Sequence, residues 1–123
     1  MPAITFFQSN QVGPACDHPR PDRLVSTHNP LRTTWEYYAR AGVSAGIWAC
    51  EPGCWKIRFA DNKDEFFCVI EGLVRLHDEA GVIVEIGPGQ AAVIPAGFIG
   101  MFEVVVAVKK YFVVTETSAA IEP

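Results

Sequence analysis

The residues with the clearest capacity for chemistry are one acid and one base, Glu65 and Lys110. Glu65 alternates along the chain with Phe67, and Lys110 alternates with Phe112. Because successive side chains of a β-strand point to opposite faces, both charged groups should share the apolar side of their strands. An isolated buried charge is too costly to keep. We therefore expect Glu65 and Lys110 to meet in the interior as a pair.

The predicted pair allows two interpretations. In the first, Glu65 and Lys110 are the polar groups of an aromatic ligand pocket: Glu65 accepts a hydrogen bond or acts as a general base, and Lys110 anchors an anionic group of the ligand. In the second, they form a structural ion pair that fixes the fold and binds nothing. The sequence leaves both open, and catalysis by either residue is a further step.

Aromatic residues flank the predicted pair. Trp55 and Phe59 lie on the apolar face of a segment whose other face carries Lys56 and Arg58. Phe102 falls on the inward face of a later segment. Large rings of this kind serve more often as core than as walls of a ligand site. Among these rings, Phe59 and Phe102 are the better candidates for the wall of a pocket.

Cysteine chemistry is a weaker prospect in this chain. Four cysteines are too few for a disulfide scaffold. Cys50 and Cys54 bracket a turn and could form a redox pair, although the usual spacing is C-x-x-C. A zinc site would need further ligands such as Cys16 and His18. We interpret the cysteines as reduced thiols that serve as small apolar side chains.

The composition excludes several classes of protein. The chain has 123 residues, enough for one domain, and it is 50% hydrophobic, which is too apolar for a disordered protein. Its 10 basic and 14 acidic side chains give a net charge of -4, so it has no overall attraction to nucleic acid or anionic lipid. No apolar stretch approaches the roughly 20 residues of a membrane-spanning helix. The sequence shows no signal-peptide pattern, and we expect a cytoplasmic protein.

The elements that must position these residues are short β-strands. The chain has 14 valines and 9 isoleucines but only 4 leucines, and branched side chains suit a pleated surface. Glycine and proline recur every few positions, as in domains with many tight turns. The pattern predicts strands over residues 43–50, 55–59, 65–70, 74–77, 82–86, 91–94, 100–106 and 108–115, with residues 71–72 as a turn.

Three regions follow from this pattern. Residues 1–34 form an arm in which a short strand over residues 4–7 precedes a proline-rich segment without period. Residues 35–117 form the β domain, which a sandwich or a jelly-roll barrel would close. Residues 118–123 form a tail that we expect to be frayed.

The glycine and proline punctuation resembles that of the cupins. Their first motif, Gly-x5-His-x-His-x3–4-Glu-x6-Gly, corresponds to Gly53, Phe59, Asp61, Glu65 and Gly72. Their second motif, Gly-x5-Pro-x-Gly-x2-His-x3-Asn, corresponds to Gly89, Pro95, Gly97, Gly100 and Val104. The family's glycines, its proline and its glutamate match, whereas its three histidines and its asparagine do not.

A branch of small single-domain cupins is similar in more detail, over about residues 35 to 115. The shared segments include Gly46-Ile47-Trp48, Asp64-Glu65-Phe66, residues 94–100 and Lys110. This branch is related to ureidoglycine aminohydrolase and to the ethanolamine-utilisation cupins, and most of its members have no assigned function. The resemblance implies an all-β, RmlC-like cupin fold, a double-stranded β-helix that is also described as a jelly-roll barrel.

The resemblance also implies which positions face one another inside the barrel. In metal-binding cupins the positions equivalent to Phe59, Asp61, Glu65 and Gly100 carry the metal. Phe59 and Gly100 offer no side-chain ligand, and His18, His28 and His77 lie outside the motif, so we predict no tightly bound metal and no cofactor. The alternative is a weak metal held by Asp61 and Glu65. Asp61 could line the mouth or cap its own turn. The predicted pocket residues are Trp55, Phe59, Asp61, Glu65, Phe67, Gly100, Phe102 and Lys110.

These expectations lead to one functional hypothesis and two rivals. The hypothesis is a metal-free cupin that binds a small polar or anionic metabolite in an aromatic barrel pocket with Glu65 and Lys110. The first rival is an enzyme that acts on a ureide-like or sugar-like small molecule, as the resemblance implies. The second is a structural or interaction module without a ligand. We also expect a homodimer, in which the arm adds a strand to the partner's sheet.

Overall fold

The structure is a computed structural model, and it describes residues 2–117. In this part of the chain it contains two short 3-10 helices and eight strands. No helix among these residues has the length and apolar character needed to cross a bilayer. The elements are η1 (Phe7–Ser9), β1 (Ala15–Asp17), η2 (Pro21–Arg23), β2 (Arg32–Arg40), β3 (Val43–Cys50), β4 (Gly53–Arg58), β5 (Lys63–Asp78), β6 (Ile83–Ile86), β7 (Ala91–Ile94) and β8 (Ile99–Glu116).

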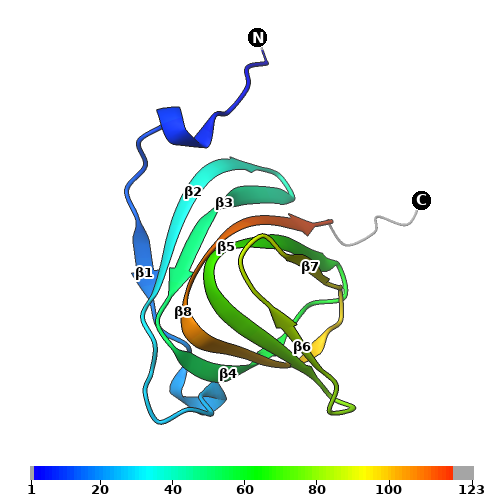
Figure 1. The fold of residues 1–123 in the computed structure, drawn as a ribbon. Coiled ribbons are helices and arrows are strands. Elements are labelled where there is room, and N and C mark those ends of the chain that lie inside the picture. Colours follow the sequence, from blue (N-terminus) through cyan, green and yellow to red (C-terminus); the bar gives the residue numbers. More distant parts are fainter. Residues whose placement is uncertain (1, 118–123) are drawn as a thin grey trace, which may run out of the picture.

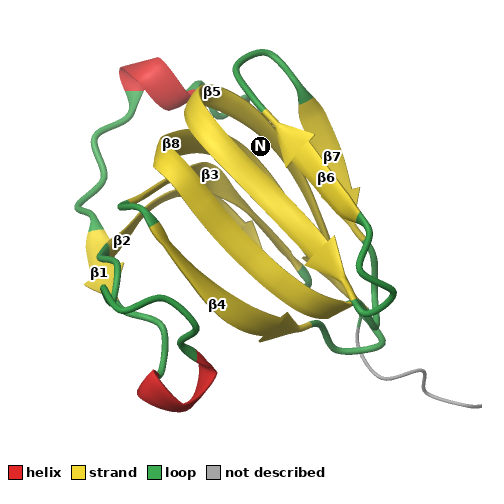
Figure 2. Ribbon diagram, turned by 60° about the horizontal axis from the view of Figure 1, so that its bottom comes forward, coloured by secondary structure: helices red, strands yellow, loops and turns green. Residues whose placement is uncertain are grey.

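The strands form one antiparallel sheet that curls into a barrel, as Figures 1 and 2 show. The two longest strands, β5 and β8, pair with each other along most of their length. β8 also pairs with β3 and β4, and β5 also pairs with β6 and β7. β3, β4, β6 and β7 all attach to this central pair, and β2 and β1 follow beyond β3, so β5 and β8 fix where inward side chains meet. The all-β prediction is confirmed.

The predicted turn at residues 71–72 is wrong, because β5 continues through it. The β5–β8 ladder instead shifts register between Val69 and Val74. Gly72 has φ of 90°, a conformation that favours glycine, and a Cβ there would lie 2.2 Å from the carbonyl oxygen of Ala107. The glycine therefore accommodates a bulge in a long strand. Val106, which alternation predicts to be inward, lies opposite this bulge and is 54% exposed.

The N-terminal arm differs from its prediction in two ways. The strand expected over residues 4–7 is wrong: the only regular element there among the described residues is η1, and the Phe7 ring stacks on Tyr37 with ring centroids 4.7 Å apart. The arm does add a strand to a sheet, but to its own: β1 pairs with β2, where Cys16 faces Thr33. The predicted tail, residues 118–123, lies outside the described residues.

The core lies between the inner faces of the barrel strands. Phe67, Val69 and Val74 are almost completely inaccessible, and Phe102 is 3% exposed. These residues follow the period-two alternation that the sequence predicts for their strands. Lys110 on β8 is 4% exposed, and it is the one charged residue classed as buried in residues 2–117. Lys110 is therefore a buried cation on the inner face of the barrel.

Candidate functional site

A cavity of about 520 Å³ opens between the inner faces of the barrel and the arm. Its apolar wall comes from the aromatic and aliphatic side chains of the inward strand faces. This wall consists of Trp48, Trp55, Ile57, Phe59, Ile94, Phe102, Phe112 and Val114. The volume is within the range of small-molecule sites, which are typically about 300–1,000 Å³. Glu65 and Lys110 also line this cavity, so its wall carries polar groups at its inner end.

Glu65 and Lys110 meet at the inner end of the cavity, as predicted. Lys110 Nζ donates a hydrogen bond to Glu65 Oε2 over 2.8 Å. The exposed fractions of the two side chains are 5% for Lys110 and 14% for Glu65. A charge-assisted hydrogen bond this short, in an interior that screens weakly, is strong. The two charges compensate each other locally, so the inner end of the cavity carries little net charge.

Three aromatic rings enclose the Lys110 ammonium. Its nitrogen lies 4.3 Å from the centroid of Phe67, 4.5 Å from that of Trp48 and 4.8 Å from that of Phe102. Each ring presents the negative face of its quadrupole to the cation, and the interaction strengthens when water is excluded. The lysine is therefore held by one carboxylate and three rings.

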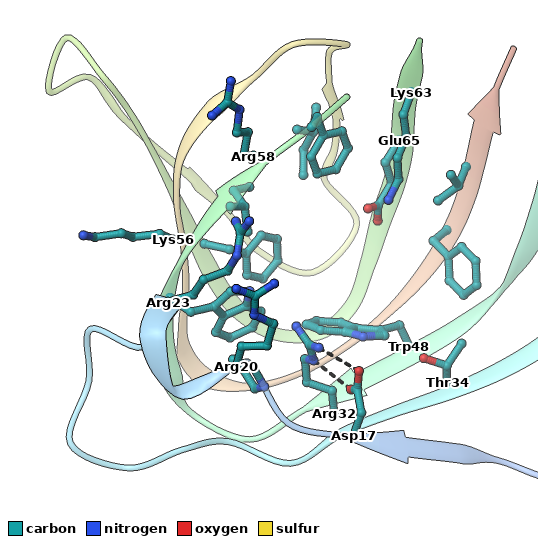
Figure 3. A pocket seen from close by; sticks show the side chains of 18 of the residues that line it. Asp17, Arg20, Arg23, Arg32, Thr34, Trp48, Lys56, Arg58, Lys63 and Glu65 are labelled. Carbon is teal, nitrogen blue, oxygen red and sulfur yellow. Dashed lines mark hydrogen bonds and ion pairs between the residues drawn. The ribbon is translucent and has the colours of Figure 1, made fainter. Parts of the chain in front are cut away.

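Glu65 keeps part of its carboxylate free for a ligand. Its Oε1 atom accepts no hydrogen bond from any of residues 2–117, although Glu65 lines the cavity. Figure 3 shows its carboxylate directed into the cavity. A carboxylate oxygen in this position can accept a hydrogen bond from a hydroxyl, amide or ammonium group of a bound molecule. Among the described residues, Glu65 is the one carboxylate that β2 to β8 contribute to the lining.

The rest of the lining is strongly cationic, which the sequence analysis missed. Seven of the chain's 10 lysines and arginines line this cavity although the whole chain is net acidic. Only two carboxylates in the described chain, Asp17 and Glu65, line it with them. The cationic lining residues are Arg20, Arg23, Arg32, Lys56, Arg58, Lys63 and Lys110.

The arm supplies three of these cations, and two of them are held by acids. Arg32 donates from Nε and Nη2 to the two oxygens of Asp17, over 2.8 and 2.7 Å. Its guanidinium also lies 5.4 Å from the Trp55 ring centroid. Arg20 donates from Nε and Nη2 to Asp22 over 3.1 and 2.6 Å. This contact with Arg20 lowers the pKa of the Asp22 carboxyl from its ordinary value.

The structure brings five of the predicted pocket residues together at the cavity and leaves three outside. Trp55, Phe59, Glu65, Phe102 and Lys110 line it. Phe67 does not, because it is fully buried behind the wall, where it contacts the Lys110 ammonium. Asp61 does not, because it lies in the exposed turn after β4, beside Gly97.

Gly100 is the third predicted residue that does not line the cavity. A Cβ built on it would lie 1.9 Å from the carbonyl oxygen of His77, on the neighbouring strand β5. Gly100 pairs with Asp78 on that strand and with Ile57 on β4. The backbone of β5 therefore occupies the place that a side chain at position 100 would take, so a histidine does not fit here without movement of the strand.

The residues present do not fit a metal ion. Of the four positions that carry the metal in metal-binding cupins, only Glu65 directs a donor into the cavity, and Lys110 already holds one of its oxygens. No three side chains of histidine, cysteine, aspartate or glutamate gather anywhere in residues 2–117. A transition-metal site needs three or four ligands, with imidazole prominent.

The histidines and cysteines are engaged elsewhere. His28 contacts Glu51, and His77 contacts Glu103 at 2.9 Å. All four cysteines are free thiols, so Cys50 and Cys54 form no disulfide. Burial raises the pKa of the Cys50 thiol to about 12, against the opposing effect of nearby cations. At neutral pH this thiol stays protonated, which suits packing rather than redox chemistry.

Comparison with solved structures places the fold among known proteins. The Clostridium difficile EutQ protein is 18% identical, with a TM-score of 0.66 over 91% of this chain and 85% of that one. A protein of unknown function from Pseudomonas syringae pv. tomato str. DC3000 is 22% identical, with a TM-score of 0.70 over 86% of this chain; the match spans only 45% of that protein.

A third solved structure is a sugar phosphate isomerase of the cupin superfamily from Silicibacter pomeroyi. It is 26% identical, with a TM-score of 0.56 over 70% of this chain and 60% of that one. The comparison with curated proteins found no match. These likenesses confirm the jelly-roll barrel that the sequence predicts.

The sequence itself matches a family model over most of the barrel. The model describes the EutQ-like cupin domain, and the match extends over residues 39–112, more than half of the chain. The matched range begins within β2 and ends within β8, so it includes Glu65 and Lys110 but not the arm. This protein therefore belongs to the family of EutQ-like cupin domains.

Proposed function

We propose that this cupin is a cytoplasmic binding protein for a small polar or anionic metabolite, which it holds in the barrel cavity without a tightly bound metal. The observation that carries the proposal is that seven cationic residues, but only two carboxylates among residues 2–117, line one aromatic cavity in a chain of net charge -4. Such a concentration of one charge attracts ligands of the opposite charge and orients them. The aromatic wall supplies the apolar contact area.

Within this proposal, Glu65 and Lys110 form the polar floor of the site. Glu65 Oε1 is available to accept a hydrogen bond from the ligand, while Oε2 stays bonded to Lys110. The three rings around the ammonium hold Lys110 in place, so the floor is preorganised. A ligand that displaced the lysine would have to compensate a buried carboxylate, and we therefore expect it to bind beside the pair and leave it intact.

A thermal-shift screen tests the proposal. The purified chain is heated with carboxylates, ureides, amines, sugars and sugar phosphates. A ligand at 100 times its dissociation constant should stabilise the protein by about 2.7 kcal/mol. The shift should be lost in the double variant Glu65→Gln with Lys110→Met and kept in Arg40→Gln, which removes a cation outside the cavity. If no compound in the screen raises the unfolding temperature, the chain is a ligand-free module and the proposal is wrong.

An enzyme on a sugar-like or ureide-like compound is the second candidate. Glu65 supports it, because a carboxylate with one free oxygen in an aromatic cavity can take a proton from a bound substrate. The similarity to a sugar phosphate isomerase supports the same candidate. Turnover of a stabilising compound, abolished by Glu65→Gln while binding persists, would favour the enzyme over the binding protein.

A further inference from the structure

We propose that the ligand carries a phosphoryl group and that the arginines of the arm bind this group at the outer end of the cavity. The inference rests on the proposed function and adds the chemical class of the ligand and its orientation. In this arrangement the phosphoryl group contacts Arg20, Arg23 and Arg32, and the neutral, hydrogen-bonding part of the ligand reaches Glu65.

The distribution of charge along the cavity gives the orientation. At the inner end, Lys110 is neutralised by Glu65 over 2.8 Å and has little attraction left for an anion. On the arm, Arg23 lines the cavity and forms no ion pair with any of residues 2–117; on the barrel strands the same holds for Lys56, Arg58 and Lys63. Figure 3 shows Arg20, Arg23 and Arg32 on one side of the cavity and Glu65 on the other. Because three guanidinium groups lie together on the arm's side, we place the anionic group of the ligand there.

The geometry of the arm's arginines suits a phosphoryl group. Arg20 and Arg32 each donate hydrogen bonds from Nε and Nη2 to an aspartate. The Nη1 atom of each therefore has no hydrogen-bond partner among the described residues. An arginine held in this way by an acid is preorganised, so less entropy is lost when the free edge binds a ligand. Arg23 adds a third guanidinium, which forms no ion pair with any of residues 2–117. Several guanidinium groups around one anion are typical of phosphate recognition.

The part of the arm that carries Arg20 and Arg23 is fixed to the barrel at both ends, whereas Arg32 lies on β2 itself. Before them, β1 pairs with β2. After them, the backbone N–H groups of Val25 and Ser26 donate to the carbonyl oxygen of Cys54 over 2.9 and 3.1 Å. The Ser26 hydroxyl in turn accepts a hydrogen bond from the Cys54 N–H over 2.9 Å. The segment between is therefore a clamp across the cavity mouth, and its arginines keep their place without a ligand.

Titration with inorganic phosphate tests the inference. The side-chain Nε–Hε resonances of the arginines are followed by two-dimensional NMR while phosphate is added at constant ionic strength. We expect saturable shifts at Arg20, Arg23 and Arg32, and binding about tenfold weaker in the double variant Arg20→Gln with Arg23→Gln. The control Arg40→Gln should bind phosphate like the natural protein. Unchanged phosphate affinity in the double variant would overturn the inference.

Two further arms of the experiment separate the alternatives. Glycerol 3-phosphate and ribose 5-phosphate should bind more tightly than phosphate, because each adds hydroxyl groups that reach toward Glu65; equal affinity for all three would identify free phosphate as the ligand and overturn the assignment to a metabolite. Phosphate binding that survives Arg20→Gln with Arg23→Gln but is lost in Lys110→Met would place the anion at the inner end. That result would overturn this inference and leave the proposed function standing.

Discussion

Glu65 and Lys110 meet although they do not face each other in the strand ladder. Glu65 on β5 pairs with Val114, and Lys110 on β8 pairs with Val69. Lys110 Nζ nevertheless lies 2.8 Å from Glu65 Oε2, because the long side chain extends along the inner face and over the ring of Phe67. The ion pair thus joins residues at two different positions along the β5–β8 ladder. It forms only if the register of these two strands is correct.

The first prediction concerns the stability that depends on this pair. Lys110→Met should lower the free energy of unfolding by about 3–5 kcal/mol, because it leaves the Glu65 carboxylate buried without a partner. The double variant Lys110→Met with Glu65→Gln should show a smaller decrease in the free energy of unfolding, because no buried charge is then left without a partner. Urea unfolding measures both. Lys109→Met, the same change at the neighbouring position that faces the other way, is the control; an equal loss in Lys109→Met would show that the burial of the pair is not the cause.

The second prediction concerns the bulge in β5. Gly72→Ala should cost about 2–4 kcal/mol, because φ is 90° and a Cβ would meet the carbonyl oxygen of Ala107 at 2.2 Å. Gly81→Ala is a matched control: φ is 87°, yet nothing lies within 4 Å of its Cβ. That variant should cost only about 1 kcal/mol, the penalty of the backbone conformation alone. If the two alanine variants unfold at the same urea concentration, β5 has no close contact at this point.

The third prediction concerns stability in acid. The Leu31 N–H and His28 hydrogen-bond the Glu51 carboxylate, and they lower its pKa from the ordinary value. A lowered pKa in the folded state adds stability above the unfolded-state pKa of about 4.3, and this stability is lost as the pH falls through the lower folded-state value. Unfolding free energies measured between neutral pH and pH 3 should therefore fall less steeply in Glu51→Gln. Identical slopes would show that Leu31 and His28 do not hold the Glu51 carboxylate in solution.

The fourth prediction concerns cysteine reactivity. Cys50 is buried, and because its pKa is raised to about 12 its thiol stays protonated at neutral pH. Cys16, in contrast, is exposed. Brief treatment with iodoacetamide at pH 7.5 should alkylate Cys16 and spare Cys50 in the folded protein. Mass spectrometry of the peptides measures each site, and the unfolded chain in urea is the control. Rapid labelling of Cys50 without urea would show that the end of β3 opens.

Homodimerisation, which the sequence predicts, stays a prediction. β1 is already paired with β2 of its own chain, so we look for the dimer contact on another surface. Phe66, Val93 and Val113 are neighbours in the ladder, and their exposed fractions are 46%, 57% and 38%. Light scattering of the full chain should give the mass of a dimer, and Phe66→Glu should lower it toward that of a monomer. A monomeric natural chain at high concentration would make the prediction wrong.

Alternation alone was enough to predict the inner wall. It places Trp55, Phe102 and Lys110 inward, because period two is strict wherever a strand is regular. It fails at Val106, because the bulge in the β5–β8 ladder reverses which side chains point inward, and no residue in the sequence marks that reversal. Gly72 misleads for a related reason: a glycine with positive φ serves a turn and a bulge equally well, and only the pairing of β5 with β8 decides between them.

The cationic side of the site could not be predicted in the same way. Arg20, Arg23 and Arg32 lie in or beside a proline-rich segment without period, so no pattern indicates where they point. Their position depends on contacts far along the chain, such as those of Val25 and Ser26 with Cys54. The net charge is misleading too, because a total of -4 does not show how positive charge gathers in one place.

The clamp, which carries Arg20 and Arg23, precedes the part of the chain that the family model matches, residues 39–112. If the arm binds the ligand as we propose, a change of ligand needs changes only in this peripheral segment and none in the strands that form the fold. For a protein of this kind, the sequence ahead of the barrel is the place to look when relatives diverge in what they bind.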